Sequence, residues 1–438
     1  MDIIKLLNEK IDADLPELAR LDSYWAGTQP AAYLAPEASK ALGNRLRTLA
    51  VNLPRLAVTA IEERLQVTGF RPSDSDEHDQ ELWRIWRRNR MAEVSAQAHT
   101  DALVYGRSFV MVWAGRDGSP QVTVESPKNV AVVHDPATRE VAAAFKRWSL
   151  DGTGYGVGYF PDRIVKYTST ASISGEVFPS TGWKETETIP NPLGVVPVVP
   201  VLNRGRLYEL DGVSEMGDLL DLSDGLNKVL SDMLVTSEFF ARPRRWVTGL
   251  EIVEDEAGNP INPFSDEAGK LWQSEDPDTR FGQFEASRLD GYTDAAALLT
   301  QQIGALSALP PHYLGLNGDQ PPSADSIRSA EASLVSRCYT IQRVFGSAWS
   351  DVADLIIAVR DGVDPRTLDY ETLWASPETR TPAQSADAAM KLRQIGVPLP
   401  VVLTETLGMT PSQVERIREA VRGEALDAAG VNLEGLLQ

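Results

Sequence analysis

The feature that most constrains the fold of this chain is a set of long helical patterns in its second half. Residues 323–360 keep apolar side chains on one helical face throughout, and residues 213–240 do the same over 28 residues. At a rise of about 1.5 Å per residue these helices would span roughly 55 Å and 42 Å. Helices with one apolar face are stable only where something covers that face.

The ends of these helices are marked by capping and breaking residues. Ser323 is the predicted N-cap of the longest helix, in which the adjacent Gly346 and Ser347 predict a bend. A further helix over residues 293–309 ends at Pro310 and Pro311. Short strands are predicted between the first two long helices, at residues 245–248, 250–253 and 270–272.

The first half of the chain has a different pattern, which predicts an α+β lobe. Helices are expected to about residue 105, interrupted by Pro54 and by a polar loop at 71–77. Strands are then predicted at 109–113, 122–125, 130–133, 141–148, 155–159 and 163–167. Beyond Gly362 we expect an extended piece at 368–374 and small helices that begin near Pro382 and Pro411.

Length and charge limit the possible functions. A chain of 438 residues predicts two or more domains or lobes. The net charge is -20, and residues 211–362 hold 25 acidic and 11 basic side chains. Proteins that wrap nucleic acid neutralise phosphates with Lys and Arg, so this balance argues against such wrapping. The single cysteine excludes an internal disulfide, and we expect neither a secretory signal nor a membrane span.

Motifs for common catalytic chemistry are missing. There is no phosphate-binding loop and no nucleophile elbow, and the four histidines lack the spacing of a zinc site. The sequence therefore predicts no enzyme activity, no cofactor and no metal. With 62 acidic residues a pair of catalytic carboxylates remains an alternative, although nothing selects one.

Three local patterns allow both a functional and a structural interpretation. Trp83 and Trp86 among arginines could stack on nucleic acid, but a buried aromatic anchor beside a solvated basic face is favoured. The acidic run at 74–79 lacks the glycine of a calcium loop and predicts a solvated loop. The glycine-rich run at 152–158 predicts a flexible hairpin, and Cys338 predicts a small packed residue.

The order of elements, together with several local stretches, resembles a known family. The stretches are residues 83–90, 102–109, 125–127, 133–135, 211–216, 238–245, 309–315 and 322–327 with Glu331. In combination they are similar to the portal, or head-to-tail connector, proteins of tailed double-stranded DNA bacteriophages. The resemblance is to the branch common among phages of actinobacteria, and it covers roughly residues 30–420.

The resemblance implies a portal-like division of the chain. Residues 1–210 would be the wing, 211–240 and 290–315 the stem helices, 241–289 the clip and 316–322 the tunnel loop. Residues 323–378 would be the long wing helix and its return strand, and 379–438 the crown. The implied site residues are Asn317, Asp319 and Gln320 in the tunnel loop, the stem acids Glu215, Asp218, Asp221 and Asp224 facing the channel, and Arg242, Arg244, Arg245 and Asn259 in the clip.

The resemblance also implies a function and partners. Twelve subunits would form a ring at one capsid vertex of the virion, assembled in the host bacterial cytoplasm. Double-stranded DNA would pass through its channel during packaging and ejection. The terminase large subunit and later the head-completion adaptors would dock on it, beside major capsid and scaffolding proteins. The alternatives are another phage head protein and, less favoured, an acidic intracellular hydrolase.

Two features of the residues themselves support this implied function. The acid excess of residues 211–362 would let DNA pass without being gripped. The long helices lack local partners, and a ring would supply them through repeated interfaces between copies of the chain.

Overall fold

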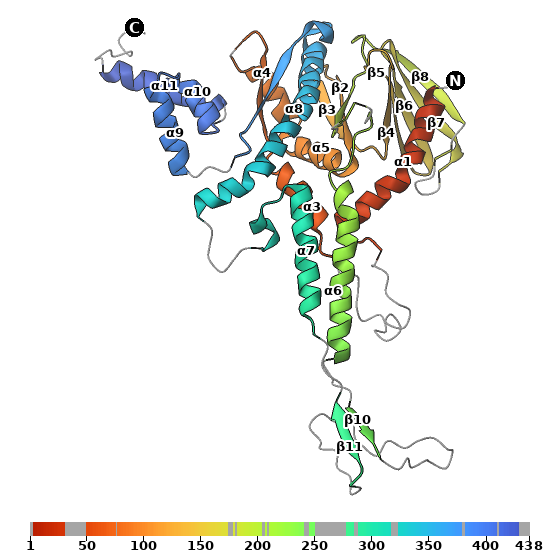
Figure 1. The fold of residues 1–438 in the computed structure, drawn as a ribbon. Coiled ribbons are helices and arrows are strands. Elements are labelled where there is room, and N and C mark those ends of the chain that lie inside the picture. The colour runs from red at the N-terminus through yellow and green to blue at the C-terminus, as the bar shows by residue number, and fades with distance from the viewer. Residues whose placement is uncertain are drawn as a thin grey trace, which may run out of the picture. The chain divides into compact units, whose positions relative to one another are not determined.

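The computed structural model describes residues 3–30, 50–75, 77–173, 178–179, 182–203, 206–207, 210–240, 245–249, 277–283, 288–316, 323–378, 382–409 and 411–428. Its contacts divide the chain into two units. The first comprises residues 1–29, 52–223 and 301–438, and the second residues 30–51 and 224–300. Helices and strands are both well represented, so the α+β prediction is confirmed (Figure 1).

The first unit contains a five-stranded antiparallel meander in the order β4-β5-β6-β7-β8. Four of its strands lie where alternating patterns predict them, whereas the very polar β8 was missed. Their bounds are Val130–His134 (β4), Val141–Leu150 (β5), Thr153–Tyr159 (β6), Arg163–Ser172 (β7) and Trp183–Pro190 (β8).

The glycine-rich run forms the end of the turn and the second strand of the β5–β6 hairpin, so the predicted hairpin is confirmed. Its flexibility stays a prediction. Asp151, with φ of +49°, and Gly152, with φ of +73°, make the turn into β6. A Cβ on Gly156 would lie 2.6 Å from the ring of Phe145 on β5. These glycines therefore allow close packing of the sheet face.

Each face of the meander is covered by another layer. Helix α1 (Ile3–Ala26) packs on one face, where Leu7 and Ile11 meet Phe145. On the other face lies a three-stranded sheet in the order β3-β2-β9, which contributes Phe109 and Met111 to a shared core. The three strands are β2 (Arg107–Ala114), β3 (Pro120–Glu125) and β9 (Val198–Leu202).

Helices cover the outer face of the three-stranded sheet. Both α5 (Met91–Tyr105) and α8 (Ala324–Asp361) contact β2, which is buried on both sides from Arg107 to Val112. Near them lie α3 (Leu53–Glu62) and α4 (Gln80–Arg88). A two-stranded sheet of β1 (Val67–Pro72) and β12 (Tyr370–Trp374) runs beside α8.

Buried aromatic rings join these helices and strands. Trp86 of α4 lies 5.2 Å from Trp349 of α8 between ring centroids, and Trp349 Nε1 donates to His99 Nε2 over 2.8 Å. Trp86 is 1% exposed while the arginines around it are exposed, so the prediction of a buried anchor beside a basic face is confirmed. Burial lowers the pKa of His99 to about 3, so its ring is neutral near pH 7.

The longest predicted helix has nearly the predicted ends. The Ser323 hydroxyl accepts from the Ser326 amide, and Gly362 ends the helix with φ of +69°. Cys338 is fully buried, as a packed residue should be. Gly346 permits close approach of β12, because a Cβ there would lie 3.0 Å from Trp374 Nε1. The bend expected at Gly346 and Ser347 stays a prediction.

The second unit contains most of two long helices, α6 (Leu220–Phe240) and α7 (Asp290–Ser307), and the antiparallel pair β10 (Arg245–Thr248) and β11 (Arg280–Gln283). The predicted helix start at residue 213 is wrong, since a short 3-10 turn at Gly217–Leu219 precedes α6. The predicted strands at 250–253 and 270–272 lie outside the described residues.

The remaining elements are short. They are η2 (Pro311–Leu314), η3 (Pro365–Thr367), α9 (Pro382–Gln394), α10 (Leu399–Val401), η4 (Val402–Thr406) and α11 (Pro411–Ala428). The C-terminal helices begin at Pro382 and Pro411, as predicted from these residues.

Candidate channel and docking surfaces

Helices α6 and α7 pack against each other in the second unit. The hydroxyls of Thr236 and Tyr292 lie 3.1 Å apart, and Leu299 approaches the position that a Cβ on Gly225 would take. The two helices carry six acidic side chains and one lysine, Lys228, which pairs with Asp232. This pair of helices is therefore apolar on some faces and negatively charged on others.

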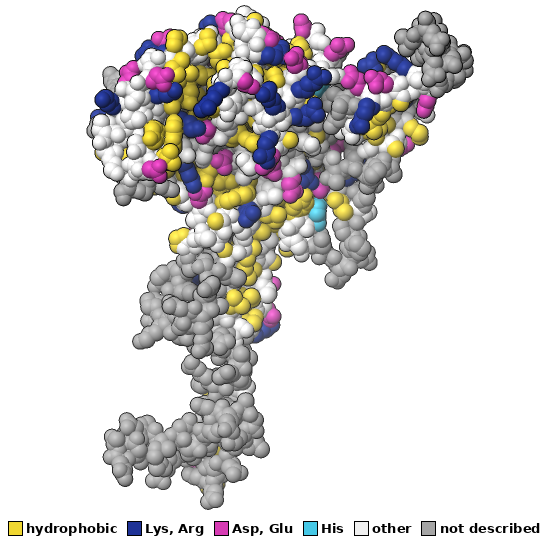
Figure 2. Space-filling model, turned by 180° about the vertical axis from the view of Figure 1, so that it is seen from behind, with side chains coloured by type: hydrophobic (Ala, Val, Ile, Leu, Met, Phe, Trp, Pro, Cys, Tyr) yellow, Lys and Arg dark blue, Asp and Glu magenta, His cyan; other side chains and the backbone are white. Residues whose placement is uncertain are grey.

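The apolar faces of these helices are incompletely covered. No described residue of α6 after Asn227 is buried, and none of α7 before Ile303. Leu234 is 37% exposed and Leu298 is 58% exposed. Figure 2 shows hydrophobic side chains at the surface along these helices. Covering such side chains would be favourable by about 25 cal/mol per Å² of apolar area.

The four predicted stem acids differ in exposure and in position relative to α6. Asp218 and Asp221 are exposed and Asp224 is half-buried, all on or next to the start of α6. Glu215 precedes the helix, is 9% exposed and pairs with Arg337 of α8. Its charge is therefore paired with an arginine of the same subunit. The channel-facing role of all four acids stays a prediction.

The other predicted site residues fall mostly outside the described residues. These are Asn317, Asp319 and Gln320 of the predicted tunnel loop, and Arg242, Arg244 and Asn259 of the predicted clip. Arg245 is the first residue of β10, opposite Gln283 of β11. All of these assignments stay predictions.

A cluster of ion pairs on α8 was missed. Arg337 contacts both Glu215 and the end of α7, and Glu331 is 5% exposed beside Arg64 and His312. The sequence shows only that Glu331 and Arg337 lie beside the apolar stripe in the first half of this helix. Their partners lie far away in the chain and carry no local pattern.

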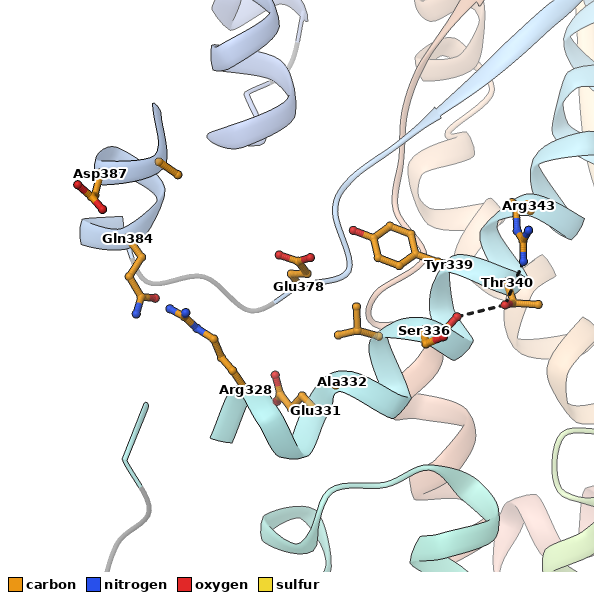
Figure 3. A pocket seen from close by; sticks show the side chains of 12 residues that line it. Arg328, Glu331, Ala332, Ser336, Tyr339, Thr340, Arg343, Glu378, Gln384 and Asp387 are labelled. Atoms are coloured by element: carbon orange, nitrogen blue, oxygen red, sulfur yellow. Dashed lines mark hydrogen bonds between the residues drawn. The ribbon is translucent and has the colours of Figure 1, made fainter. Parts of the chain in front are cut away.

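A cavity of about 800 Å³ borders the first half of α8 (Figure 3). Its walls combine Arg328, Glu331, Tyr339 and Arg343 of α8 with Glu378 and with Gln384 and Asp387 of α9. Charges of both signs line it. Within the described part of the chain, no group of His, Cys, Asp and Glu side chains could hold a metal ion. Among the described helices, none is long and apolar enough to cross a bilayer.

Comparison with known proteins identifies the family. The family described as "Phage portal protein, SPP1 Gp6-like" matches residues 4–424. The chain is 35% identical over 356 residues to the portal protein of Mycobacterium phage L5, covering 78% of this chain and 72% of that protein. It is 34% identical over 354 residues to the portal protein of Mycobacterium phage D29, again covering 78% and 72%.

Solved structures also resemble the chain, at lower sequence identity. One is from the virion of a native gene transfer agent particle, with TM-score 0.48, 13% identity and coverage of 86% of this chain and 94% of that one. Another is from the neck of such a particle, computed with C12 symmetry, with TM-score 0.48, 14% identity and coverage of 87% and 95%.

The sequence matches define a structural protein of phage particles. The chain belongs to the phage portal protein family, and the resemblance to actinobacterial-phage portals is confirmed by the two mycobacterial phage relatives. By this membership it is a portal protein of a phage. The alternatives of another head protein and of an acidic hydrolase are not favoured.

Proposed function

We propose that copies of this chain, twelve as the family resemblance implies, close into a ring in which α6 and α7 line the channel for double-stranded DNA. The observation that carries this proposal is the uncovered apolar surface of α6 and α7, represented by Leu234 and Leu298. A neighbouring copy would cover it, and a closed ring covers it in every subunit alike.

The charge of the same helices suits passage of DNA. Six acids and one lysine on α6 and α7 repel phosphate, and Asp218, Asp221 and Asp224 are the proposed channel acids. Changing all three to lysine should make the ring retain DNA, with binding that weakens steeply as salt is raised. Equal DNA binding by the variant and wild-type rings at 50 mM salt would argue against a channel role.

The parts of the chain then take the roles that the resemblance implies. Residues 1–210 and 323–378 form the wing, 211–240 and 290–315 the stem, 241–289 the clip and 379–438 the crown. The clip, with Arg242, Arg244, Arg245 and Asn259, docks the terminase large subunit and later the head-completion adaptors. The tunnel loop at 316–322 touches DNA through Asn317, Asp319 and Gln320. The wing and crown face the major capsid and scaffolding proteins during assembly in the host cytoplasm.

The ring acts without catalysis and without a cofactor. Purified protein should neither hydrolyse ATP nor cleave DNA. Turnover that follows the protein through several columns and disappears on a point substitution in this chain would contradict this part of the proposal.

The decisive test of the ring is its direct observation. Light scattering and electron micrographs of purified protein, and of assembled heads, should reveal a closed annular oligomer with a central hole. Particles without a central channel under all of these conditions would refute the proposal.

A further inference from the structure

One arginine of α8 contacts both the end of α7 and the segment that leads into α6. Arg337 Nη1 donates to the Leu306 carbonyl over 2.9 Å, in the last turn of α7. Its Nε faces the carboxylate of Glu215, in the segment that leads into α6. That segment is itself fixed, since the Glu215 amide donates to the Leu103 carbonyl over 2.8 Å. Three segments distant in sequence therefore meet at Arg337.

A buried glutamate earlier on α8 holds the segment that follows α7. Glu331 Oε1 lies 3.4 Å from Arg64 Nη2 and 3.5 Å from His312 Nε2. The Arg64 guanidinium also lies over the ring of Tyr313, 5.9 Å from its centroid. Glu331 and Arg337 are separated by roughly 9 Å along the helix.

Glu215 and Glu331 are largely buried, so each of these carboxylates needs its charged partner. Removing one member of a buried ion pair leaves the other unpaired in a poorly solvated site, which is strongly unfavourable. The planar guanidinium of Arg337 can serve the carboxylate of Glu215 and the carbonyl of Leu306 at once, whereas a lysine is a single point charge. The two contacts of Arg337 thus depend on one side chain in one position.

The same stretch of α8 borders open space. Glu331 belongs to the lining of the cavity of about 800 Å³ that separates this part of α8 from α9 (Figure 3). On that flank the helix is not enclosed by packed side chains, although its inner face buries Leu334 and Cys338. The charged contacts of Glu331 and Arg337 therefore add to a narrow apolar contact. The second half of α8 is buried over more of its surface, and its large side chains Phe345, Trp349 and Val352 are fully buried.

We propose that Glu331 and Arg337 form a charged clamp that couples the first half of α8 to the segment that leads into α6 and to the end of α7. A shift of this part of α8 must then move the segment before α6, the last turn of α7 and η2 together. The clamp is a conformational device within one subunit. Its existence does not require the ring, although in a ring it would pass movement from α8 to the helices proposed to line the channel.

The test is hydrogen exchange of the full chain, followed by mass spectrometry, in clamp variants. Arg337→Met should accelerate exchange on the order of tenfold in residues 213–222 and 301–309 together. Arg337→Lys should keep the pair with Glu215 and accelerate only residues 301–309. Glu331→Gln should accelerate residues 311–316 and leave 213–222 unchanged.

Two controls separate the clamp from a general loss of stability. Arg343→Met changes the same residue type at an exposed position of α8 and should leave all of these segments unchanged. Strand β2 reports on the global fold. Unchanged exchange in both 213–222 and 301–309 of Arg337→Met would overturn the proposal. A uniform acceleration that includes β2 would also overturn it, and Arg337→Lys remains informative if the methionine variant does not fold.

Discussion

The layered sheets of the first unit and the α6–α7 pair of the second contain equally regular apolar patterns, but only the first unit covers them. Strand β2 is buried from Arg107 to Val112, between the meander and the helices α5 and α8. In contrast, α6 has no buried described residue after Asn227, and α7 has none before Ile303. An amphipathic pattern therefore states that a face will be covered, but not whether the same chain covers it.

This comparison predicts that substitutions in the core of the first unit lower the free energy of unfolding of the subunit. Trp349→Ala should lower the free energy of unfolding by about 3–5 kcal/mol, because a fully buried indole and its contacts with Trp86 and His99 are lost. Urea unfolding followed by circular dichroism measures this. A loss below about 1 kcal/mol would mean that the aromatic cluster is not part of the core.

Glycine-to-alanine changes should have opposite signs in the two regions. Gly156→Ala should destabilise by about 1–3 kcal/mol, because its Cβ would lie 2.6 Å from the buried ring of Phe145. Gly225→Ala in α6 should stabilise by about 0.5–1 kcal/mol, because alanine favours the helix and its nearest new contact, with Leu299, is 3.7 Å. Urea titrations of both variants test the pair, and effects of the same sign would contradict the packing described for these sites.

Lowering the pH should reduce the free energy of unfolding by a smaller amount. Burial lowers the pKa of His99 to about 3, so the folded state keeps the ring neutral while the unfolded chain takes up a proton below about pH 6.5. Protonation thus favours the unfolded chain as pH falls from about 6.5 towards 3. Between pH 6.5 and 5.5 this should cost about 1 kcal/mol. His99→Gln keeps an acceptor for Trp349 and does not titrate, so its stability should fall less over this range, and identical pH profiles would refute the assignment.

Much of the fold could be predicted because its signals are local. Ser323 and Gly362 mark the two ends of α8, and Gly106 ends α5 with φ of +88°. The start of α6 was wrong because tertiary contacts override helix propensity there: the Val213 amide donates to the Asn203 carbonyl over 2.7 Å. Strand β1 was missed because the helical spacing of apolar residues was followed beyond Glu62, where α3 ends. Strand β8 was missed because its side chains are almost all exposed and polar.

The candidate site was predictable to a smaller degree. An acidic helical segment was visible in the sequence, and Asp218 and Asp221 are exposed as expected. The different position of Glu215 was not visible, because its partner Arg337 is 122 residues away and the pairing depends on the fold. The exposure of Leu234 and Leu298 was equally hidden, since an apolar residue at helical spacing looks the same whether its cover lies within the chain or in a neighbour.

The central claim is that α6 and α7 meet neighbouring copies of the chain, and two leucines of equal exposure test it most directly. Leu298 on α7 and Leu150 on β5 are both 58% exposed. Changing either to aspartate should alter the free energy of unfolding of the subunit by no more than about 0.5 kcal/mol. Mass photometry under conditions in which the wild-type ring forms should then find single subunits for Leu298→Asp and closed rings for Leu150→Asp. Rings of wild-type mass from Leu298→Asp would contradict the account.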